Sequence, residues 1–322
     1  MALWASAENI PHLLFHGCEG VGKKTKIMGL LKEIFGPSVE KLKMDQRTFQ
    51  TPSSRTLEIN IISSNFHIEL NPSDAGIYDR IVVQDIIKEM AQTQQVSSSA
   101  ARKFKDSLTK NAQHALRRTM EKYMRNLRVI MCCTSLANII QPLQSRCLIV
   151  RNSAPTTQDI IPILEHVASK ENFQLPNSIA VRIAEQSDRN LRKAILMLEA
   201  TYVTQFPFSD NVDLPLPDWE TIVNDLAKSL LDAQSPAVVL KSRSTLYELL
   251  THCIPPTDIL KKLVQFLLDK VDDNIKPDII LEAAKYEERM NKGQKPIFHL
   301  EAFVAKFQAM YKRFLMELDV DF

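Results

Sequence analysis

A short glycine-rich stretch near the amino terminus carries the residue types needed to hold a phosphate. Its sequence is Gly17-Cys18-Glu19-Gly20-Val21-Gly22-Lys23-Lys24-Thr25. Glycines allow the backbone to turn tightly, so that its N–H groups point at phosphate oxygens near the positive end of a helix. A lysine at the position of Lys23 reaches the terminal phosphates as a point charge. The stretch predicts a phosphate-binding loop, whose candidate nucleotide-binding residues are Gly17, Gly20, Gly22, Lys23, Lys24 and Thr25.

The segments on both sides of this loop support that interpretation. The apolar residues 11–15 predict a buried strand, and residues 26–35 predict a helix that ends at Gly36-Pro37. Strand, loop and helix in this order are the context that a phosphate-binding loop needs. The alternative is a glycine-rich turn that holds no ligand.

The loop lacks one of its catalytic parts. The position after the lysine normally holds Ser or Thr, whose hydroxyl helps to hold Mg²⁺. Here that position is Lys24, and Thr25 comes one residue too late. We therefore expect nucleotide binding to survive this change better than nucleotide hydrolysis does.

Two arginines farther along the chain could place positive charge beside a nucleotide. Arg146 stands at the start of the last predicted strand, where it could stabilise γ-phosphate charge on a neighbouring subunit, as an arginine finger does. Arg192 opens a predicted helix and could touch phosphates from a lid. From the spacing alone, the alternatives are a surface arginine at a strand start for Arg146 and a charge at a solvated helix start for Arg192.

Basic residues also recur along a predicted helix at 78–92. Arg80 and Lys88 are eight places apart and therefore lie loosely on one face. Contacts to a nucleic-acid backbone need only positive charge at intervals, so these two residues are candidates for DNA binding. A solvated helix face is the alternative, and the same alternative applies to Arg117 and Arg118.

Composition excludes several classes of protein. Forty Lys and Arg against 38 Asp and Glu give a net charge of +2, so any nucleic-acid contact must come from a local patch. Five cysteines and seven histidines show neither a disulfide framework nor metal-ligand spacing, and no Gly-x-Ser-x-Gly motif is present. Zinc chemistry and covalent catalysis are therefore not supported, and no metal ligand is predicted.

Cysteine usage favours the cytosol or the nucleus, and no apolar stretch reaches 18 residues.

The pattern of elements along the 322 residues predicts four segments. Short β-rich runs alternate with helical ones up to about residue 151, which is typical of an α/β domain with a mainly parallel sheet. Further strands are expected at 39–44, 129–133 and 147–150, and an antiparallel hairpin at 56–62 and 65–70. Strand signals then fade. The predicted parts are an α/β nucleotide-binding domain (1–153), a three-helix lid (154–205), a proline-rich linker (206–218) and an all-helical domain (219–322).

Taken together, four stretches resemble the small subunits of eukaryotic replication factor C, the clamp loader that places the sliding clamp PCNA on primed DNA. They are residues 11–17, 17–25, 115–123 and 141–147, the last with the sequence Gln-Pro-Leu-Gln-Ser-Arg-Cys. The Gly-Lys-Lys-Thr loop and the segments 249–256 and 297–301 resemble the subunit type with a degenerate ATP site, numbered as the fifth subunit in fungi.

This resemblance implies an AAA+ domain, a lid and a helical collar that joins a heteropentamer in the nucleus. The implied partners are the large subunit, three other small subunits, PCNA and primer-template DNA, with checkpoint and cohesion large subunits as alternatives and no membrane. The implied ligand is ATP or ADP, and Mg²⁺ is left open. Arg146 resembles the finger that acts in trans, Arg192 the lid sensor, and Arg80 with Lys88 the groups that track DNA. Thr134 stands where active relatives carry a sensor Asn.

The chain departs from the family in two places. An apolar strand ending in an acidic pair, the Walker B strand, is expected between Phe104-Lys105 and Asp106-Ser107, but Lys105 runs straight into Asp106. We therefore expect a sheet without this central strand, and Asp106 is not a catalytic carboxylate. A Lys-Tyr-Arg-Pro segment that contacts adenine is also missing near the amino terminus. Clean deletions of this kind suggest an alternative transcript or a gene-model error, which sequencing the transcript would test.

Three functional hypotheses follow. In the first, the chain is a clamp-loader subunit in DNA replication and repair that supplies Arg146 to a neighbour, with little or no hydrolysis of its own. The second is an autonomous AAA+ ATPase, against which Lys24 and the missing acidic pair argue. The third is a truncated, non-functional isoform that acts only as a collar-binding module.

Overall fold

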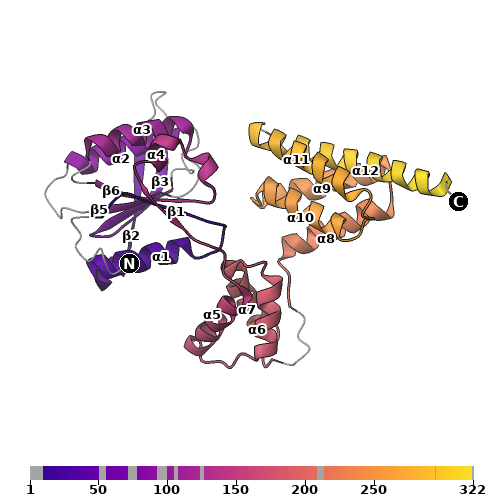
Figure 1. Ribbon diagram of the computed structural model, residues 1–322, viewed down its shortest axis with the longest axis horizontal. Helices are drawn as coiled ribbons and strands as arrows, with labels where there is room; N and C mark the ends of the chain where they lie inside the picture. Colours follow the sequence, from indigo (N-terminus) through magenta and orange to yellow (C-terminus); the bar gives the residue numbers. More distant parts are fainter. Residues whose placement is uncertain are drawn as a thin grey trace. The chain divides into compact units, whose positions relative to one another are not determined.

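The computed structural model describes residues 10–50, 56–71, 78–92, 100–104, 108–123, 127–208, 214–293 and 295–320. Contacts divide the chain into two compact units, Met1–Leu214 and Pro215–Phe322. The first unit holds a sheet with helices on its faces, followed by a three-helix lid, and the second is helical (Figure 1). The division falls within the segment 206–218, where the sequence predicts a linker.

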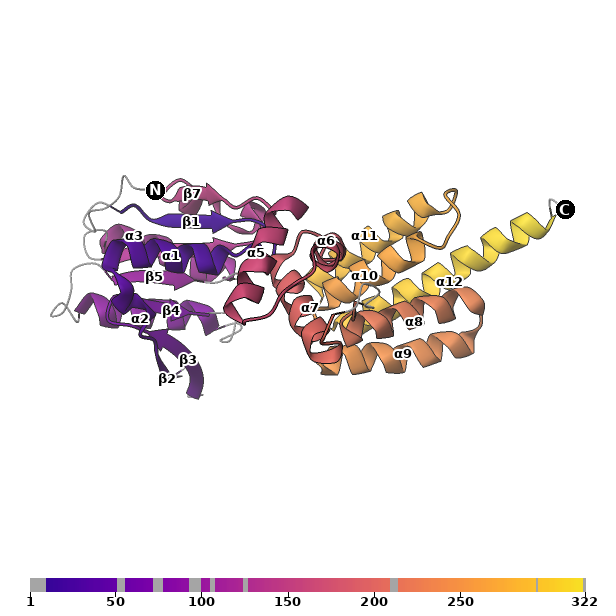
Figure 2. The same cartoon turned by 90° about the horizontal axis from the view of Figure 1, so that it is seen from below.

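The sheet of the first unit has seven strands in the order β2-β3-β4-β5-β6-β1-β7. Its strands are β1 (Leu13–His16), β2 (Lys43–Gln50), β3 (Thr56–Ser63), β4 (His67–Leu70), β5 (Ala100–Phe104), β6 (Leu127–Cys133) and β7 (Leu148–Arg151). The five strands from β4 to β7 in this order run parallel, whereas β2, β3 and β4 are joined by antiparallel pairings. Figure 2 shows β2 and β3 at one edge of the sheet. The predicted parallel sheet and the predicted hairpin are both present.

Helices cover both faces of this sheet. α1 (Lys23–Phe35) lies on one face, and α2 (Asp79–Gln92) and α3 (Lys110–Lys122) lie on the other (Figure 1). The side chains of β1 alternate accordingly: Leu13 and Phe15 pack in the cluster that contains residues of α1, and Leu14 packs in the cluster that contains residues of α2 and α3. Because the strand is buried on both faces, its sequence is an apolar run rather than an alternating one.

The expectation that the sheet lacks a central strand is wrong. β5 lies between β4 and β6 and is parallel to both, with Phe104 paired to Leu70 on one side and to Met131 on the other. Without a strand between them, β4 and β6 would leave buried backbone N–H and C=O groups unpaired. The segment before Lys105 pairs with these groups. Its sequence, Ala-Ala-Arg-Lys-Phe, contains no carboxylate. The strand position is filled, but no acidic pair comes with it, and Asp106 lies outside the described residues.

The strand predicted at 39–44 is also placed differently. Residues Pro37–Glu40 form a short 3₁₀ helix, and strand β2 begins only at Lys43. Gly36, at φ 81°, ends α1, and the fixed φ of Pro37 favours a tight helical turn directly after it. Val39 is fully buried in the cluster of α1, which holds this turn against the sheet.

The lid consists of the three predicted helices, α5 (Thr157–Lys170), α6 (Asn177–Gln186) and α7 (Leu191–Thr204). The predicted capping box is present: the backbone N–H of Thr156 donates to the carboxylate of Asp159, and the backbone N–H of Asp159 donates to the hydroxyl of Thr156. Hydrogen bonds from Thr156 to the carboxylate hold the pKa of Asp159 below its ordinary value. The lid therefore begins at a helix start that the local sequence specifies.

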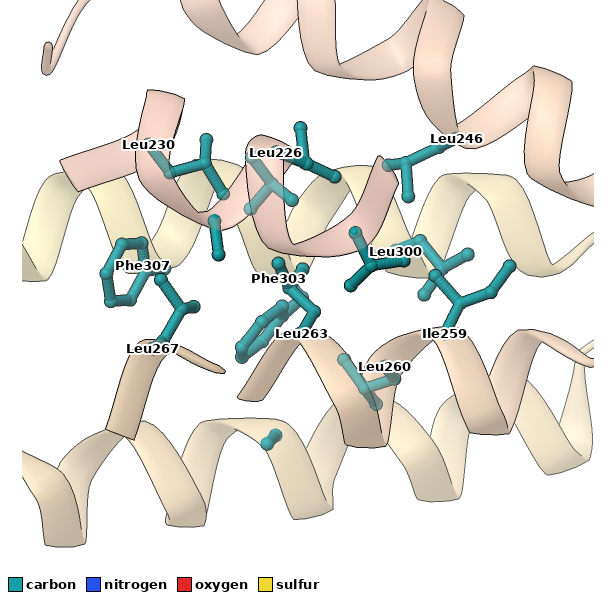
Figure 3. Packing of buried hydrophobic residues seen from close by; sticks show 14 of the residues in the cluster. Leu226, Leu230, Leu246, Ile259, Leu260, Leu263, Leu267, Leu300, Phe303 and Phe307 are labelled. Atoms are coloured by element: carbon teal, nitrogen blue, oxygen red, sulfur yellow. The ribbon is translucent and has the colours of Figure 1, made fainter. Parts of the chain in front are cut away.

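The second unit contains five packed helices in the described residues. They are α8 (Asp218–Asp232), α9 (Pro236–Thr251), α10 (Pro256–Leu268), α11 (Lys276–Lys292) and α12 (Pro296–Val320). Figure 3 shows their shared core, in which Leu263 of α10 and Phe303 of α12 point toward one another from facing helices. No helix in the described part of the chain is long and apolar enough to span a bilayer.

Candidate nucleotide site

The phosphate-binding loop connects β1 to α1 with its glycines in conformations that other residues avoid. Gly22 precedes the first residue of α1 with φ 78° and ψ 25°, the left-handed region. The ammonium of Lys23 donates to the carbonyl oxygens of Gly17 at 2.6 Å and Cys18 at 3.3 Å. The lysine therefore lies over the loop, where phosphate oxygens would compete with these carbonyls for its charge.

A cavity of about 450 Å³ opens over this loop. Its size is within the range of small-molecule sites in proteins. The wall is built from four elements: the loop with the start of α1, β4, β6 and the first turns of α7. The lining residues are Glu19, Gly20, Val21, Gly22, Lys23, Lys24, Thr25, Glu69, Cys132, Leu191, Arg192, Ile195 and Leu196. Six of the predicted nucleotide-binding residues thus meet at one cavity, and Gly17 accepts a hydrogen bond from Lys23 beside it.

The lid reaches the loop through backbone contacts. The N–H of Arg192 donates to the carbonyl oxygen of Gly20 at 3.3 Å. Asn190 caps α7, and its side-chain oxygen accepts from the N–H of Lys193 at 3.1 Å. A Cβ atom on Gly20 would stand 1.7 Å from the same oxygen of Asn190. Gly20 is therefore required both for its φ of +70° and for the close approach of the lid.

We expect Gly20→Ala to destabilise the first unit by about 2–3 kcal/mol, because it combines left-handed strain with displacement of a helix cap. Chemical denaturation of the full chain measures this change. The matched control is Gly29→Ala, since Gly29 is helical and a Cβ there meets nothing within 4 Å. That control should stabilise the chain by roughly 0.5–1 kcal/mol. Equal stabilities of the two variants would contradict the assigned role of Gly20.

Lys24 contacts a carboxylate that the sequence analysis did not identify. Its ammonium lies 2.7 Å from Oε1 of Glu69, near the end of β4. The Lys24 side chain is 59 % exposed and that of Glu69 only 14 %. Ligands of α/β proteins bind outside the carboxyl ends of parallel strands, so the position of Glu69 at a strand end was the available signal.

This set of donors does not fit the Mg²⁺ that a phosphate-binding loop ordinarily uses. Mg²⁺ takes oxygen ligands, whereas the ammonium of Lys24 carries three donors and no lone pair. The same ammonium is bound to the carboxylate that lines this part of the wall. In the described part of the chain, no group of three His, Cys, Asp or Glu side chains that could hold a metal ion is found.

Arg146 lies two residues after the end of α4 (Gln141–Gln144) and contacts Glu121 of α3. Its guanidinium donates to the carbonyl oxygen of Pro142 at 2.7 Å and to Oε1 of Glu121 at 2.6 Å. Arg117 donates to the same carboxylate oxygen at 3.3 Å. These hydrogen bonds hold the pKa of Glu121 below its ordinary value. The hydrogen bond from Arg117 has the larger effect, and that from Arg146 the next. Arg146 does not line the cavity described above.

Cys147, which follows Arg146 in the chain, does not provide a thiolate nucleophile. Burial raises the pKa of Cys147 to about 12, so the group stays protonated at neutral pH.

The two DNA-binding candidates lie on α2. Arg80 is exposed at the second residue of this helix, and Lys88 stands two turns later, where side chains lie outside the described set. The start of α2 is fixed by Asp79, whose carboxylate accepts from the N–H of Thr109 at 2.7 Å and from its hydroxyl at 3.0 Å. The predicted sensor position, Thr134, follows β6 and is half-buried.

Two family models match the helical parts of the chain. The C-terminal domain of replication factor C subunit 3 matches residues 219–315, which span the five helices from α8 to α12. The RCF1/5-like AAA+ ATPase lid domain matches residues 162–203, within α5 to α7.

Relatives match over nearly the whole chain. Replication factor C subunit 5 of Neurospora crassa is 50 % identical, and the match covers 98 % of this chain and 92 % of that protein. The chain belongs to the replication factor C small-subunit family. Replication factor C subunit 3 of the mouse is also 50 % identical, over 95 % of this chain and 88 % of that protein. Replication factor C small subunits are clamp-loader components, and this one has the AAA+ sheet, the helical lid and the helical C-terminal domain.

Among solved structures, the RuvB Holliday junction branch migration motor of Thermotoga maritima resembles this replication factor C subunit at 15 % identity. Its TM-score is 0.48, and the match covers 69 % of this chain and 68 % of that chain.

Proposed function

We propose that this chain is the degenerate-site small subunit of a heteropentameric clamp loader that loads PCNA onto primer-template DNA in replication and repair. The observation that carries the proposal is the 50 % identity to replication factor C subunit 5 of Neurospora crassa over 98 % of the chain. The partners are a large subunit and three other small subunits. The large subunit is of the replicative type, with the checkpoint and cohesion types as alternatives, and the complex works in the nucleus.

Within this complex, the subunit contributes contacts and charge rather than turnover. Its own site holds ATP or ADP over the loop that ends at Lys23. It hydrolyses little or none, because Lys24 replaces the usual hydroxyl and β5 brings no carboxylate to the centre of the sheet. Arg146 acts in trans on the nucleotide of a neighbouring subunit. Arg192 contacts the phosphates of this subunit's own nucleotide when the lid is closed.

Co-expression with the four partner subunits tests the proposal. We expect the tagged chain to co-purify with them and the complex to load PCNA onto primed circular DNA when ATP is present. The control is the same preparation without this chain. Assembly without loading would favour the collar-binding isoform. Mg²⁺-dependent ATP turnover by the chain alone, lost in Lys23→Ala, would favour the autonomous ATPase.

The DNA contacts make a separate prediction. Replacing Arg80 and Lys88 together by alanine should weaken DNA binding of the pentamer for all sequences and flatten its salt dependence, by about 0.9 in the logarithmic slope for each lost phosphate contact. Fluorescence anisotropy at several salt concentrations measures the slope.

The matched control for this pair is the double variant Lys26→Ala and Lys32→Ala, which removes the same charge from α1 on the opposite face of the sheet (Figure 1). Its slope should equal that of the unmodified pentamer. A loss of affinity confined to one DNA sequence, or equal effects of the two double variants, would remove α2 from the DNA surface.

A further inference from the structure

The nucleotide cavity carries its charges in an arrangement that suits a phosphate chain without a divalent metal. Three cationic side chains, those of Lys23, Lys24 and Arg192, line it together with the carboxylates of Glu19 and Glu69. The loop also presents the amino-terminal end of α1, which starts at Lys23. Backbone N–H groups at a helix start already favour an anion at this place.

Lys24 occupies the position from which a hydroxyl would hold the metal. It is the second residue of α1, one place after the lysine that lies over the loop. Its ammonium has no lone pair with which to ligate a metal, and it can donate charge-assisted hydrogen bonds to a phosphate oxygen.

Glu69 holds this ammonium at the wall of the cavity. The two groups form an ion pair at 2.7 Å, and the carboxylate is mostly buried, at 14 % exposed. Both residues line the wall above the loop. A long lysine side chain that is 59 % exposed would otherwise sample many rotamers, and this contact restricts it to the side of the nucleotide.

We propose that this site binds the polyphosphate of a nucleoside di- or triphosphate without a divalent metal, with the Lys24 ammonium, positioned by Glu69, as the cation in the metal's place. The inference rests on the nucleotide binding proposed above and names the form of ligand that the site accepts. It assigns Lys24 a binding role and Glu69 a positioning role.

Titration of the full chain with a fluorescent N-methylanthraniloyl derivative of ADP tests the inference. One buffer contains excess Mg²⁺ and the other contains EDTA. We expect the two dissociation constants of the unmodified chain to agree within about threefold, since the metal contributes no essential contact. Binding only in the Mg²⁺ buffer would overturn the inference and leave the nucleotide site in place. Absence of binding in both buffers would overturn the nucleotide site itself.

The variant Lys24→Thr restores the usual hydroxyl and removes the ammonium. Its affinity in EDTA should fall roughly tenfold or more, the size expected for one charge-assisted hydrogen bond, and Mg²⁺ should recover most of that loss. Lys24→Arg keeps a cation at the same place and should bind in EDTA as the unmodified chain does.

The matched control is Lys26→Thr, which removes the same charge from an exposed residue of α1 that does not line the cavity. It should leave both dissociation constants unchanged. If Lys24→Thr binds in EDTA as tightly as Lys26→Thr, Lys24 does not replace the metal and the inference fails. Circular dichroism and thermal unfolding of each variant establish that the comparison is between folded chains.

Discussion

Replacing Arg146 by alanine should leave the pentamer assembled and lower ATP turnover at the neighbouring site by up to about 10³-fold. A guanidinium that reaches a neighbour's γ-phosphate stabilises charge that develops during phosphoryl transfer. The surface hydrogen bonds that Arg146 makes to Glu121 and Pro142 contribute little to folding, so the variant should fold normally.

Single-turnover hydrolysis by the assembled pentamer measures the effect. Arg117→Ala is the matched control, because Arg117 donates to the same oxygen of Glu121 and its loss removes the same kind of surface ion pair. Turnover of the Arg117 variant should stay near that of the unmodified pentamer. Unchanged turnover in the Arg146 variant, or equal losses in both variants, would remove the role assigned to Arg146.

Replacing Phe303 by alanine should unfold or severely weaken the second unit. The side chain is 1 % exposed in the shared core, and the ring of Tyr286 meets it edge to face at 6.1 Å between centroids. Truncation of a buried phenylalanine costs about 3–5 kcal/mol, which is a large part of the stability of an ordinary domain. Since the proposed collar joins the subunits, co-purification with the four partners should fall as well.

Phe298 provides the control for this prediction. It lies on the same helix, α12, but is 58 % exposed. Phe298→Ala should change the free energy of unfolding by less than about 0.5 kcal/mol. Denaturant unfolding followed by circular dichroism compares the two variants, and similar midpoints would show that the core in Figure 3 does not hold the unit together.

Those parts of the fold that depend on local sequence were predictable. The loop at 17–25, the capping box at Thr156 and the three lid helices follow from residue types at short range, and the structure has each of them. The placement of β5 was not predictable in this way. Its segment has two small residues followed by two charged ones, without the apolar run or alternation of a typical strand. It becomes a strand because β4 and β6 offer backbone groups on both sides, a condition set by residues far apart in the chain.

The same distinction applies to the candidate site. The loop lysines and Arg192 could be named from motifs, whereas Glu69 could not, because its contact with Lys24 joins residues 45 positions apart through the sheet. The sequence identified the unusual residue at position 24 but not the carboxylate that holds it. The role proposed for Arg146 depends on the nucleotide of a neighbouring subunit, so the spacing of residues within this chain does not specify it.

The carboxylate of Glu121 accepts hydrogen bonds from Arg117 and Arg146 at the same oxygen. When Arg146 turns toward another anion, Arg117 stays on the same oxygen, so Glu121 is not left as a charge without a cation. The guanidinium of Arg146 then exchanges one hydrogen-bonded anion for another, while Glu121 keeps its hydrogen bond from Arg117. In the proposed mechanism, Glu121 therefore holds the guanidinium of Arg146 until a phosphate of the neighbouring subunit replaces the carboxylate.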